Sequence, residues 1–238
     1  MVNLGVEPGE LIRRYPRLYH MAADGSWESI SKHGLLSTSA LLDLFEYRDE
    51  QRYALEACRR PESVIIEHPE HGRAVIRDQK PMDDKGLRRS LQGMAPEDWY
   101  RTLNKRAFFW LTRERLQRML NAAAYRDKRH VVLTLDTSVL VERHRERIVL
   151  SPMNSGATKP YPFPRGLDTF QRLGSYPFAD MLKKRGNQDP IVELAIDYSV
   201  PDVREMVLTV ELMKNAQVSD IIFNAEQKGK GKGATSHL

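Results

Sequence analysis

Hydrophobic residues along the chain occur in patterns that predict both strands and helices. Short apolar runs predict five strands, at residues 17–21, 107–111, 130–135, 191–198 and 206–212. Polar residues alternate with apolar ones in part of the run 191–198, which predicts a strand half exposed to solvent. Two further runs, 63–68 and 73–78, flank the turn formers at 69–72 and predict a β-hairpin.

Helices are predicted between these strands. The segments are residues 26–33, a stretch starting near 38, about 85–92, 96–104 and a stretch after 112. The last is the clearest, because Leu116, Met119, Leu120 and Ala123 follow helical spacing and Thr112 is a suitable N-cap. Regular crossover helices do not separate the strands. The order of elements therefore favours an α+β fold with a mixed or antiparallel sheet over a doubly wound one.

The length of 238 residues fits one sizeable domain. We predict a single domain at residues 1–226 and a flexible, basic Gly/Lys tail at 227–238. The segment 151–165 is rich in Pro, Gly, Ser and Asn and predicts a long loop. Long loops in compact domains are usually functional or disordered.

The sequence also indicates a compartment. No apolar run approaches the roughly 18 residues that a membrane-spanning helix needs, and the N-terminal residues lack the pattern of a secretory signal. Cys58 is the only cysteine, so it forms no internal disulfide and builds no thiolate zinc site. We predict a soluble, cytoplasmic protein with no membrane partner.

The formal net charge of +5 is unevenly distributed. Between residues 101 and 130, nine cations face two acids, a local excess of +7. The nine are Arg101, Lys105, Arg106, Arg113, Arg115, Arg118, Arg126, Lys128 and Arg129. Such a segment suits the phosphates of a nucleotide or a nucleic acid, and it is equally consistent with a solvated helix face.

Familiar catalytic motifs are absent. The chain has no G-x-x-x-x-G-K-[ST], G-x-G-x-x-G, G-x-S-x-G or H-E-x-x-H sequence. This weakens the nucleotide-hydrolase, dinucleotide-oxidoreductase, serine-hydrolase and zincin classes. His68 and His71 form a His-x-x-His pair without further ligands nearby, so we predict no metal site.

Three separated segments carry the residues best suited to chemistry. The first is Leu18-Tyr19-His20, followed by a helix and Gly34-Leu35-Leu36-Ser37. The second, Phe109-Trp110-Leu111-Thr112, leads into an arginine-bearing helix. The third begins at Glu193 and runs to Pro201.

These segments resemble motifs of the ADP-ribosyltransferase superfamily in its small bacterial forms. The similar groups are DarT-type nucleic-acid transferases, rifampin-modifying transferases and, more distantly, tRNA 2′-phosphotransferases. The last group is disfavoured, because this sequence lacks the double set of Arg and His expected of a phosphotransferase. The resemblance implies a split, mostly antiparallel β-sheet core with flanking helices. It also implies NAD as co-substrate, without a metal.

The resemblance assigns cofactor-binding roles to His20, Tyr19, Phe109, Trp110, Thr112, Arg115 and Arg118. The His20 imidazole is expected to orient the ribose of NAD. Phe109 or Trp110, where members of the superfamily often carry a tyrosine, is expected to stack on nicotinamide. Arg115 or Arg118 is expected to hold the pyrophosphate.

Glu193 and His20 are the expected catalytic residues. Cleavage of the nicotinamide–ribose bond passes through an oxocarbenium-like state, as in glycoside hydrolysis. The Glu193 carboxylate is expected to bind the ribose hydroxyl, stabilise that cation and activate the nucleophile.

Each candidate also has a structural interpretation. His20 is consistent with a hydrogen-bonded, half-buried histidine. Phe109 and Trp110 are consistent with core residues, and one strand would bury only one of them. Glu193 is consistent with a solvent-facing strand residue. The polar stretch 76–79 is consistent with a local ion pair or a substrate contact.

The leading hypothesis is transfer of ADP-ribose from NAD to a macromolecule. Nucleic acid ranks ahead of protein as the acceptor because of the basic segment. The resemblance alone suggests a toxin or phage-defence effector, with an antitoxin or regulatory protein as a partner. The alternatives are a non-catalytic nucleic-acid-binding protein and an NAD glycohydrolase.

Overall fold

The computed structural model describes residues 5–186 and 188–226, and the predicted tail at 227–238 lies outside this part. One eight-stranded sheet runs through it. In spatial order its strands are β10 (Gln171–Arg172), β8 (Ile148–Ser151), β11 (Glu193–Asp197), β6 (Arg106–Trp110), β1 (Arg17–Ala23), β7 (His130–Asp136), β13 (Val207–Lys214) and β14 (Gln217–Asn224). Every neighbouring pair is antiparallel. The predicted α+β class with an antiparallel sheet is confirmed.

The sheet is nearly divided in its middle. Strand β1 pairs with β7 along its whole length, from Arg17 to Ala23. On its other side β1 pairs with β6 at one position only, Tyr19 opposite Trp110. Two four-stranded halves therefore meet at a single register pair. Beyond that pair, backbone groups of β1 and β6 are free to face side chains in the gap.

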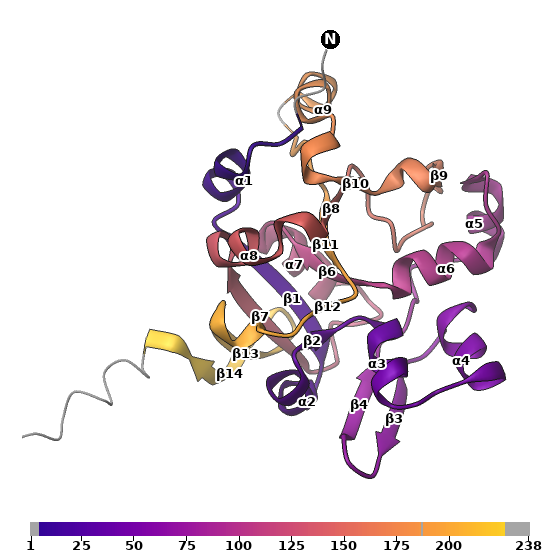
Figure 1. Cartoon of the computed structure of the whole chain (residues 1–238), viewed down its shortest axis with the longest axis vertical. Helices are drawn as coiled ribbons and strands as arrows, with labels where there is room; N and C mark the ends of the chain where they lie inside the picture. The colour runs from indigo at the N-terminus through magenta and orange to yellow at the C-terminus, as the bar shows by residue number, and fades with distance from the viewer. Residues whose placement is uncertain (1–4, 187, 227–238) are drawn as a thin grey trace, which may run out of the picture.

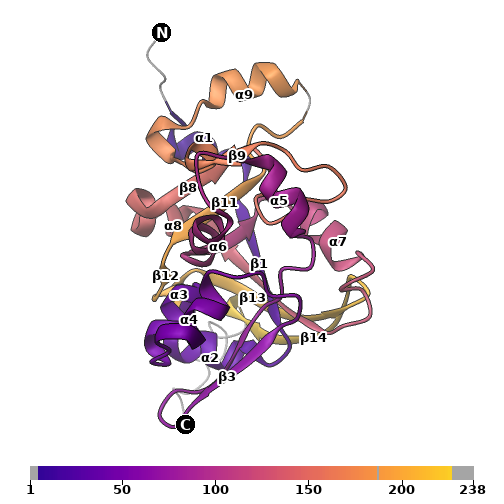
Figure 2. The same cartoon turned by 90° about the vertical axis from the view of Figure 1, so that its right-hand side faces the viewer.

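Nine α-helices surround the sheet in the described part of the chain (Figure 1). They are α1 (Pro8–Arg14), α2 (Ser26–His33), α3 (Thr38–Leu44), α4 (Asp49–Glu56), α5 (Asp84–Ser90), α6 (Pro96–Asn104), α7 (Arg113–Leu120), α8 (Thr137–His144) and α9 (Phe178–Arg185). Short 3₁₀ turns lie at Arg145–Arg147, Leu167–Thr169, Leu173–Ser175 and Val203–Glu205. Figure 2 shows α9 and the hairpin of β3 (Val64–His68) and β4 (Gly72–Ile76) at opposite ends of the molecule.

Among the residues that the structure describes, three two-stranded sheets accompany the main sheet, and two of them join segments that are distant in the chain. Strands β3 (Val64–His68) and β4 (Gly72–Ile76) form the predicted hairpin. Strand β2 (Leu35–Leu36) pairs with β12 (Ser199–Val200), and β5 (Leu91–Gln92) pairs in parallel with β9 (Arg165–Gly166).

Gly34 ends α2 with a φ of +85°, and a Cβ there would lie 2.5 Å from the Pro201 Cα. This close approach joins the first and third predicted segments, and only glycine permits it.

The two faces of the central strands have different neighbours. Leu18, Phe109 and Leu133 lie in the main core, which also takes residues from α1 and α8. Tyr19 and Trp110 lie on the other face, with Leu116 of α7. Phe109 is 1% exposed and Trp110 is half-buried. The expectation that the strand buries only one of the two aromatics is confirmed.

The prediction for residues 191–198 is wrong in one respect. The strand forms as β11, but Glu193, Leu194, Ala195 and Ile196 are all buried instead of alternating with exposed positions. The reason is its position between β6 and β8, with further elements covering both faces. The structural interpretation of Glu193 as a solvent-facing residue is wrong for the same reason.

Candidate active site

A cavity of about 250 Å³ opens where the two halves of the sheet separate. Its lining includes His20 of β1, Trp110 of β6 and Glu193 of β11, together with Arg77, which follows β4. We call it the split cavity. Residues far apart in the chain meet here because β1, β6 and β11 are neighbours in the sheet.

Two further cavities share lining residues with the split cavity. The middle cavity, of about 230 Å³, shares Arg77, Trp110 and Glu193 with it and adds Asn104 and Ser155. The outer cavity, of about 680 Å³, shares Trp110 with both. The cations that line the outer cavity are Lys80, Arg115, Arg118 and Lys159. The three cavities are therefore adjacent, and the split cavity is mostly apolar whereas the outer one is larger and cationic.

Glu193 is the buried acid of this site. It begins β11, lies opposite Trp110 on β6 and is 7% exposed. Its Oε2 accepts a hydrogen bond of 3.0 Å from the Ser155 backbone N–H. No Lys or Arg of the described ranges forms an ion pair with it within 4 Å.

Burial raises the pKa of Glu193 to about 7, while hydrogen bonding to Ser155 and the charges of Arg165 and Arg115 act in the opposite direction. A carboxyl group that titrates near pH 7 can both accept and donate a proton under ordinary conditions.

His20 has a defined tautomer. Its Nδ1 lies 2.9 Å from the Phe108 carbonyl oxygen, a group that β6 does not use to pair with β1. A carbonyl only accepts hydrogen bonds, so Nδ1 carries the hydrogen and Nε2 keeps its lone pair. Burial lowers the pKa of His20 to about 4, and the nearby charge of Arg77 acts in the same direction. The ring is therefore neutral near pH 7, with Nε2 as an acceptor.

His20 and Glu193 line one cavity, although the register places them on different faces of the strands. Glu193, Trp110 and Tyr19 are cross-strand partners and share a face. His20 follows Tyr19 and points to the face of Phe109, whose ring lies 5.9 Å from the imidazole. The two catalytic candidates line the same cavity because the sheet separates between β1 and β6.

The predicted aromatic candidates are placed differently from one another. Trp110 lines all three cavities, whereas Phe109 lines the split cavity from within the core. Tyr19 lies outside the three cavities, with the Arg113 guanidinium 5.9 Å from its ring. Trp110 is thus the aromatic residue best placed to contact a planar ligand.

The predicted residues of α7 divide in the same way. Thr112 caps the helix by accepting a hydrogen bond of 3.3 Å from the Arg115 N–H, and it lies outside the three cavities. Arg115 lines the outer cavity and also pairs with Asp189, with Nη2 3.2 Å from Oδ2. Arg118 lines the same cavity and forms no ion pair in the part of the chain described.

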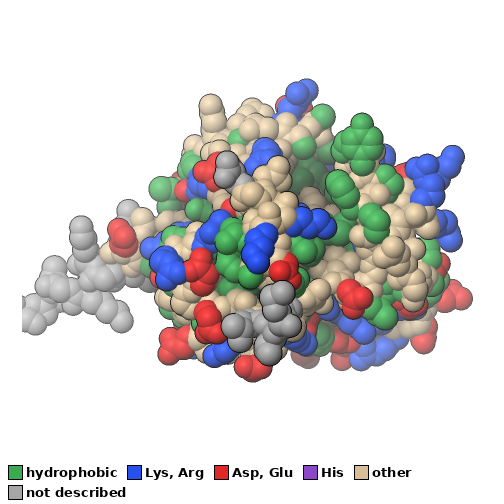
Figure 3. All heavy atoms as spheres, turned by 90° about the horizontal axis from the view of Figure 1, so that it is seen from above, with side chains coloured by type: hydrophobic (Ala, Val, Ile, Leu, Met, Phe, Trp, Pro, Cys, Tyr) green, Lys and Arg blue, Asp and Glu red, His purple; other side chains and the backbone are tan. Residues whose placement is uncertain are grey.

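Most of the basic segment is neutralised by the fold. Five of its nine cations pair with carboxylates from outside the segment: Arg101 with Asp98, Arg106 with Asp197, Arg113 with Glu211, Arg115 with Asp189 and Arg129 with Asp24. On the face shown in Figure 3, basic and acidic side chains are interspersed. The local excess of charge counted along the sequence therefore does not form one free basic surface.

Several residues of the site carried no strong sequence signal. All four residues of the polar stretch 76–79 line a cavity, and Arg77 lines both the split and the middle cavity. Its Nη1 donates to the Met21 carbonyl at 3.1 Å and its guanidinium lies 5.3 Å from the Tyr125 ring. The loop predicted at 151–165 supplies Ser155. Only its composition marked it in advance, because the position of a loop relative to a strand depends on tertiary contacts.

No group of three or more His, Cys, Asp or Glu residues suited to a metal ion exists within residues 5–186 and 188–226. His68 and His71 stack on each other, with ring centroids 4.5 Å apart. In the same ranges, no helix has the length and apolar character required to cross a bilayer.

Fold and site together define an α+β protein with a divided antiparallel sheet and a buried acid at the division. The profile of DUF7002, a family of unknown function, matches residues 16–207. The chain belongs to this family, and the match includes both His20 and Glu193. A comparison with curated proteins finds no match.

Proposed function

We propose that the protein is an NAD-dependent ADP-ribosyltransferase that modifies a macromolecule, with nucleic acid ahead of protein as the acceptor. One observation carries the proposal: His20, Trp110 and Glu193, from three strands, line the same cavity at the division of the sheet. The resemblance of the three sequence segments to ADP-ribosyltransferases supports it.

The three adjacent cavities suit the parts of NAD. Nicotinamide would lie against Trp110, and the adjoining ribose would donate a hydroxyl hydrogen to the free Nε2 of His20. The pyrophosphate would reach Arg115 and Arg118 in the outer cavity. Asp189 competes for Arg115, so Arg118 is the better phosphate ligand of the two.

The chemistry follows from the buried acid. As the bond between nicotinamide and ribose breaks, its electron pair leaves with nicotinamide and positive charge develops on the ribose. The ionised Glu193 stabilises that charge strongly, because little water screens it in a buried site. The acceptor then attacks the ribose carbon and passes its proton to the Glu193 carboxylate.

The acceptor defines the alternatives. Water as the acceptor would make the protein an NAD glycohydrolase. A nucleic acid would enter through the outer cavity, whose lining contains Lys80, Arg118 and Lys159 but no acidic residue. A role as a toxin or phage-defence effector, with a neutralising partner protein, belongs to the same proposal.

Release of nicotinamide tests the proposal. The protein is incubated with NAD, with and without single-stranded and duplex nucleic acid, and free nicotinamide is measured by chromatography. We expect release by the wild-type chain and none by Glu193→Ala. Release that needs no acceptor indicates a glycohydrolase. Nucleic-acid binding without any release would support the non-catalytic alternative and reject the enzyme.

A further inference from the structure

A buried arginine lies behind the loop that approaches Glu193. Arg165 begins β9 and is 1% exposed, yet it forms no ion pair with any described Asp or Glu. A buried guanidinium requires hydrogen-bond partners for its N–H groups, because burying them unpaired is costly. The partners of Arg165 show what it holds.

All three of its nitrogens bond to the backbone of one loop, residues 152–164, which we call the Ser155 loop. Nη1 donates to the Ser155 carbonyl at 2.9 Å, and Nη2 donates to the Ala157 carbonyl at 2.8 Å. Nε donates to the Phe163 carbonyl at 3.1 Å. Both arms of the loop are thus fastened to one rigid, planar group.

The arginine is itself firmly held. Its backbone pairs with Leu91 across β5 and β9, and its guanidinium lies 5.8 Å from the Trp99 ring. The next residue, Gly166, passes so close to Gln92 that a Cβ would lie 2.5 Å from the Gln92 carbonyl oxygen. The guanidinium is therefore held in place, and its hydrogen bonds fix the position of the loop.

The Ser155 loop delivers one group to the acid. Ser155 accepts from Arg165 through its carbonyl and donates from its N–H to Glu193 Oε2 at 3.0 Å. Asn154, Ser155 and Gly156 also line the middle cavity beside Glu193. We propose that Arg165 is a positioning residue, which holds the Ser155 loop so that the Ser155 amide reaches the Glu193 carboxylate.

The geometry predicts two separate consequences of losing Arg165. Without the three hydrogen bonds the loop loosens, and the Ser155 N–H no longer favours the ionised carboxylate. Without the positive charge, Glu193 loses a neighbour that also favours ionisation. The other cation whose charge acts on the Glu193 pKa is Arg115. The charged residues that line the middle cavity together with Glu193 are Arg60, Arg77, Asp78 and Arg106. These remain in an Arg165 variant.

Arg165→Gln and Arg165→Lys separate the two consequences, with Arg147→Gln as the matched control. Arg147 is a half-buried arginine that also donates to backbone carbonyls, those of Ser199 at 2.7 Å and Asp197 at 3.5 Å. It lies at the opposite end of β11 from Glu193. The Glu193 carboxyl is titrated by carbon NMR, assigned by its loss in Glu193→Gln, and Ser155 amide exchange is followed in the same samples.

We expect Arg165→Gln to raise the Glu193 titration midpoint by about one pH unit and to accelerate Ser155 amide exchange. Arg165→Lys keeps the positive charge but loses the planar guanidinium that makes three hydrogen bonds. It should accelerate Ser155 amide exchange as much as Arg165→Gln does, but raise the Glu193 midpoint less. Arg147→Gln should change neither. An unchanged midpoint and unchanged exchange in folded Arg165→Gln would overturn the proposal. If that variant does not fold, unchanged exchange in Arg165→Lys would overturn it.

The catalytic meaning of this inference rests on the proposed function, but its test does not. The titration and the exchange measurement need no NAD. If they change as expected while the wild-type chain releases no nicotinamide, the proposed enzyme fails and Arg165 still positions Glu193. If nicotinamide is released, the pH midpoint of release should move in Arg165→Gln in the same direction as the carboxyl titration.

Discussion

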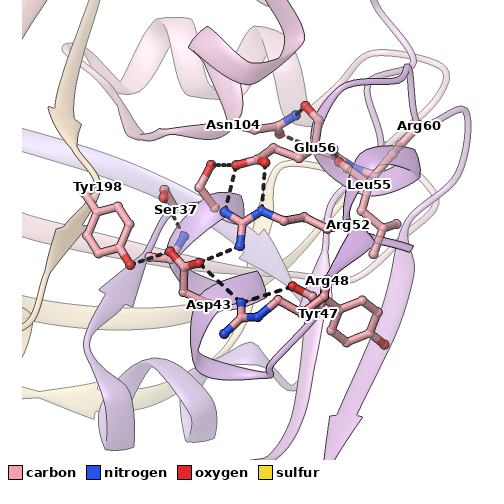
Figure 4. A network of polar contacts seen from close by, with 12 residues as sticks. Ser37, Asp43, Tyr47, Arg48, Arg52, Leu55, Glu56, Arg60, Asn104 and Tyr198 are labelled. Atoms are coloured by element: carbon pink, nitrogen blue, oxygen red, sulfur yellow. Dashed lines mark hydrogen bonds and ion pairs between the residues drawn. The ribbon is translucent and has the colours of Figure 1, made fainter. Parts of the chain in front are cut away.

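Two glutamates of this protein are almost equally hidden, yet their surroundings differ. Glu56 at the end of α4 is 8% exposed, and Glu193 at the start of β11 is 7% exposed. Glu56 accepts from Arg52 Nε at 3.0 Å and Nη2 at 3.2 Å, and from the Ser39 hydroxyl (Figure 4). Glu193 accepts one backbone N–H and has no ion-pair partner in the described part of the chain.

The two pKa values move in opposite directions. Burial alone would raise the pKa of Glu56, but hydrogen bonds from Arg52 and Ser39 outweigh it and lower the pKa. Burial dominates at Glu193 and raises the pKa to about 7. Two carboxyl groups of similar solvent exposure therefore differ in pKa, because Glu193 is enclosed more deeply by protein atoms and has fewer donors than Glu56. Glu56 is a scaffold residue whose ionised form is favoured, and Glu193 exchanges protons near neutrality.

The surroundings of Glu56 also explain its structural role. In Figure 4, Arg52 connects Glu56 to Asp43, and Asn104 connects the Glu56 backbone carbonyl to Arg60. Arg60 and Asn104 line the middle cavity. The paired glutamate thus supports a wall of the site, whereas the unpaired one faces into the site.

Catalysis should separate the two acids most strongly. We expect Glu193→Gln to reduce nicotinamide release by about 10²–10⁴-fold, because the amide carries no charge and takes no proton. Glu56→Gln should keep the wild-type release but lower the free energy of unfolding by about 1–2 kcal/mol through weaker bonds to Arg52. Chromatography and urea denaturation measure the two effects. A folded Glu193→Gln with wild-type release would remove Glu193 from the mechanism.

The dependence of release on pH should follow the same acid. The ionised form of Glu193 is the active one, so kcat/KM should rise as pH increases through about 7. His20 is already neutral in this range, because its pKa lies at about 4. Release assayed from pH 5 to 9 checks this. A profile that falls across neutrality would mean that the protonated acid is required instead.

Stability should depend on pH with opposite signs at the two sites. The folded state binds the Glu193 proton more tightly than the unfolded chain, so stability falls as pH rises from the usual value of 4.5 to about 7. Glu56 has a lowered pKa, so its contribution is present above its usual value and is lost as pH falls through the folded value.

Substitution of Glu193 should therefore stabilise the protein under alkaline conditions. At about 1.4 kcal/mol for each pH unit between folded and unfolded pKa, Glu193→Gln should gain roughly 3–3.5 kcal/mol over the wild type at pH 8. Below pH 4.5 the two proteins should unfold alike. Urea denaturation at both pH values measures the difference. A gain of the same size at acid pH would point to packing and not to the charge of the carboxylate.

The sequence predicted secondary structure better than it predicted the burial and the ion pairs of individual side chains. Local signals identified the helix after Thr112 and the hairpin, because capping and turn residues act over a few positions. The basic segment looked free because the carboxylates that neutralise it, such as Asp189 and Glu211, lie far away in the chain. Burial of Glu193 was missed because it depends on β8, a strand that the apolar pattern did not predict.

Candidate residues followed the same rule. His20, Trp110 and Glu193 line one cavity, as the resemblance led us to expect, whereas Tyr19 and Thr112 lie outside the three cavities. A sequence motif can identify a strand, but the register of the sheet decides which side chains of that strand face a cavity. The polarity of the stretch 76–79 indicated Arg77 only as one of several candidates, because its position rests on a contact with Met21. Arg165 had no sequence signal, because its role rests on contacts with the loop around Ser155.

The smallest expected effect concerns the exposed edge of the network formed by Glu56, Arg52 and Asp43. Tyr198 donates its hydroxyl hydrogen to Asp43 Oδ2 at 2.6 Å, but the residue is 46% exposed. Asp43 also pairs with Arg52, and the Tyr198 backbone carbonyl still accepts from the Ser37 N–H after substitution. Tyr198→Phe should therefore change the free energy of unfolding by no more than about 0.5 kcal/mol, with unchanged nicotinamide release.

Arg52→Gln is the matched control for Tyr198→Phe, since it removes the partner that Asp43 and Glu56 share. It should destabilise by about 1–3 kcal/mol, because a carboxylate with little solvent access loses its charged donor. If Tyr198→Phe costs as much as Arg52→Gln, the network responds as one unit out to its exposed rim. The ionised state of Glu56 would then depend on the whole network and not on Arg52 and Ser39 alone. Glu56 and Glu193 would differ because one belongs to an extended hydrogen-bond network and the other does not.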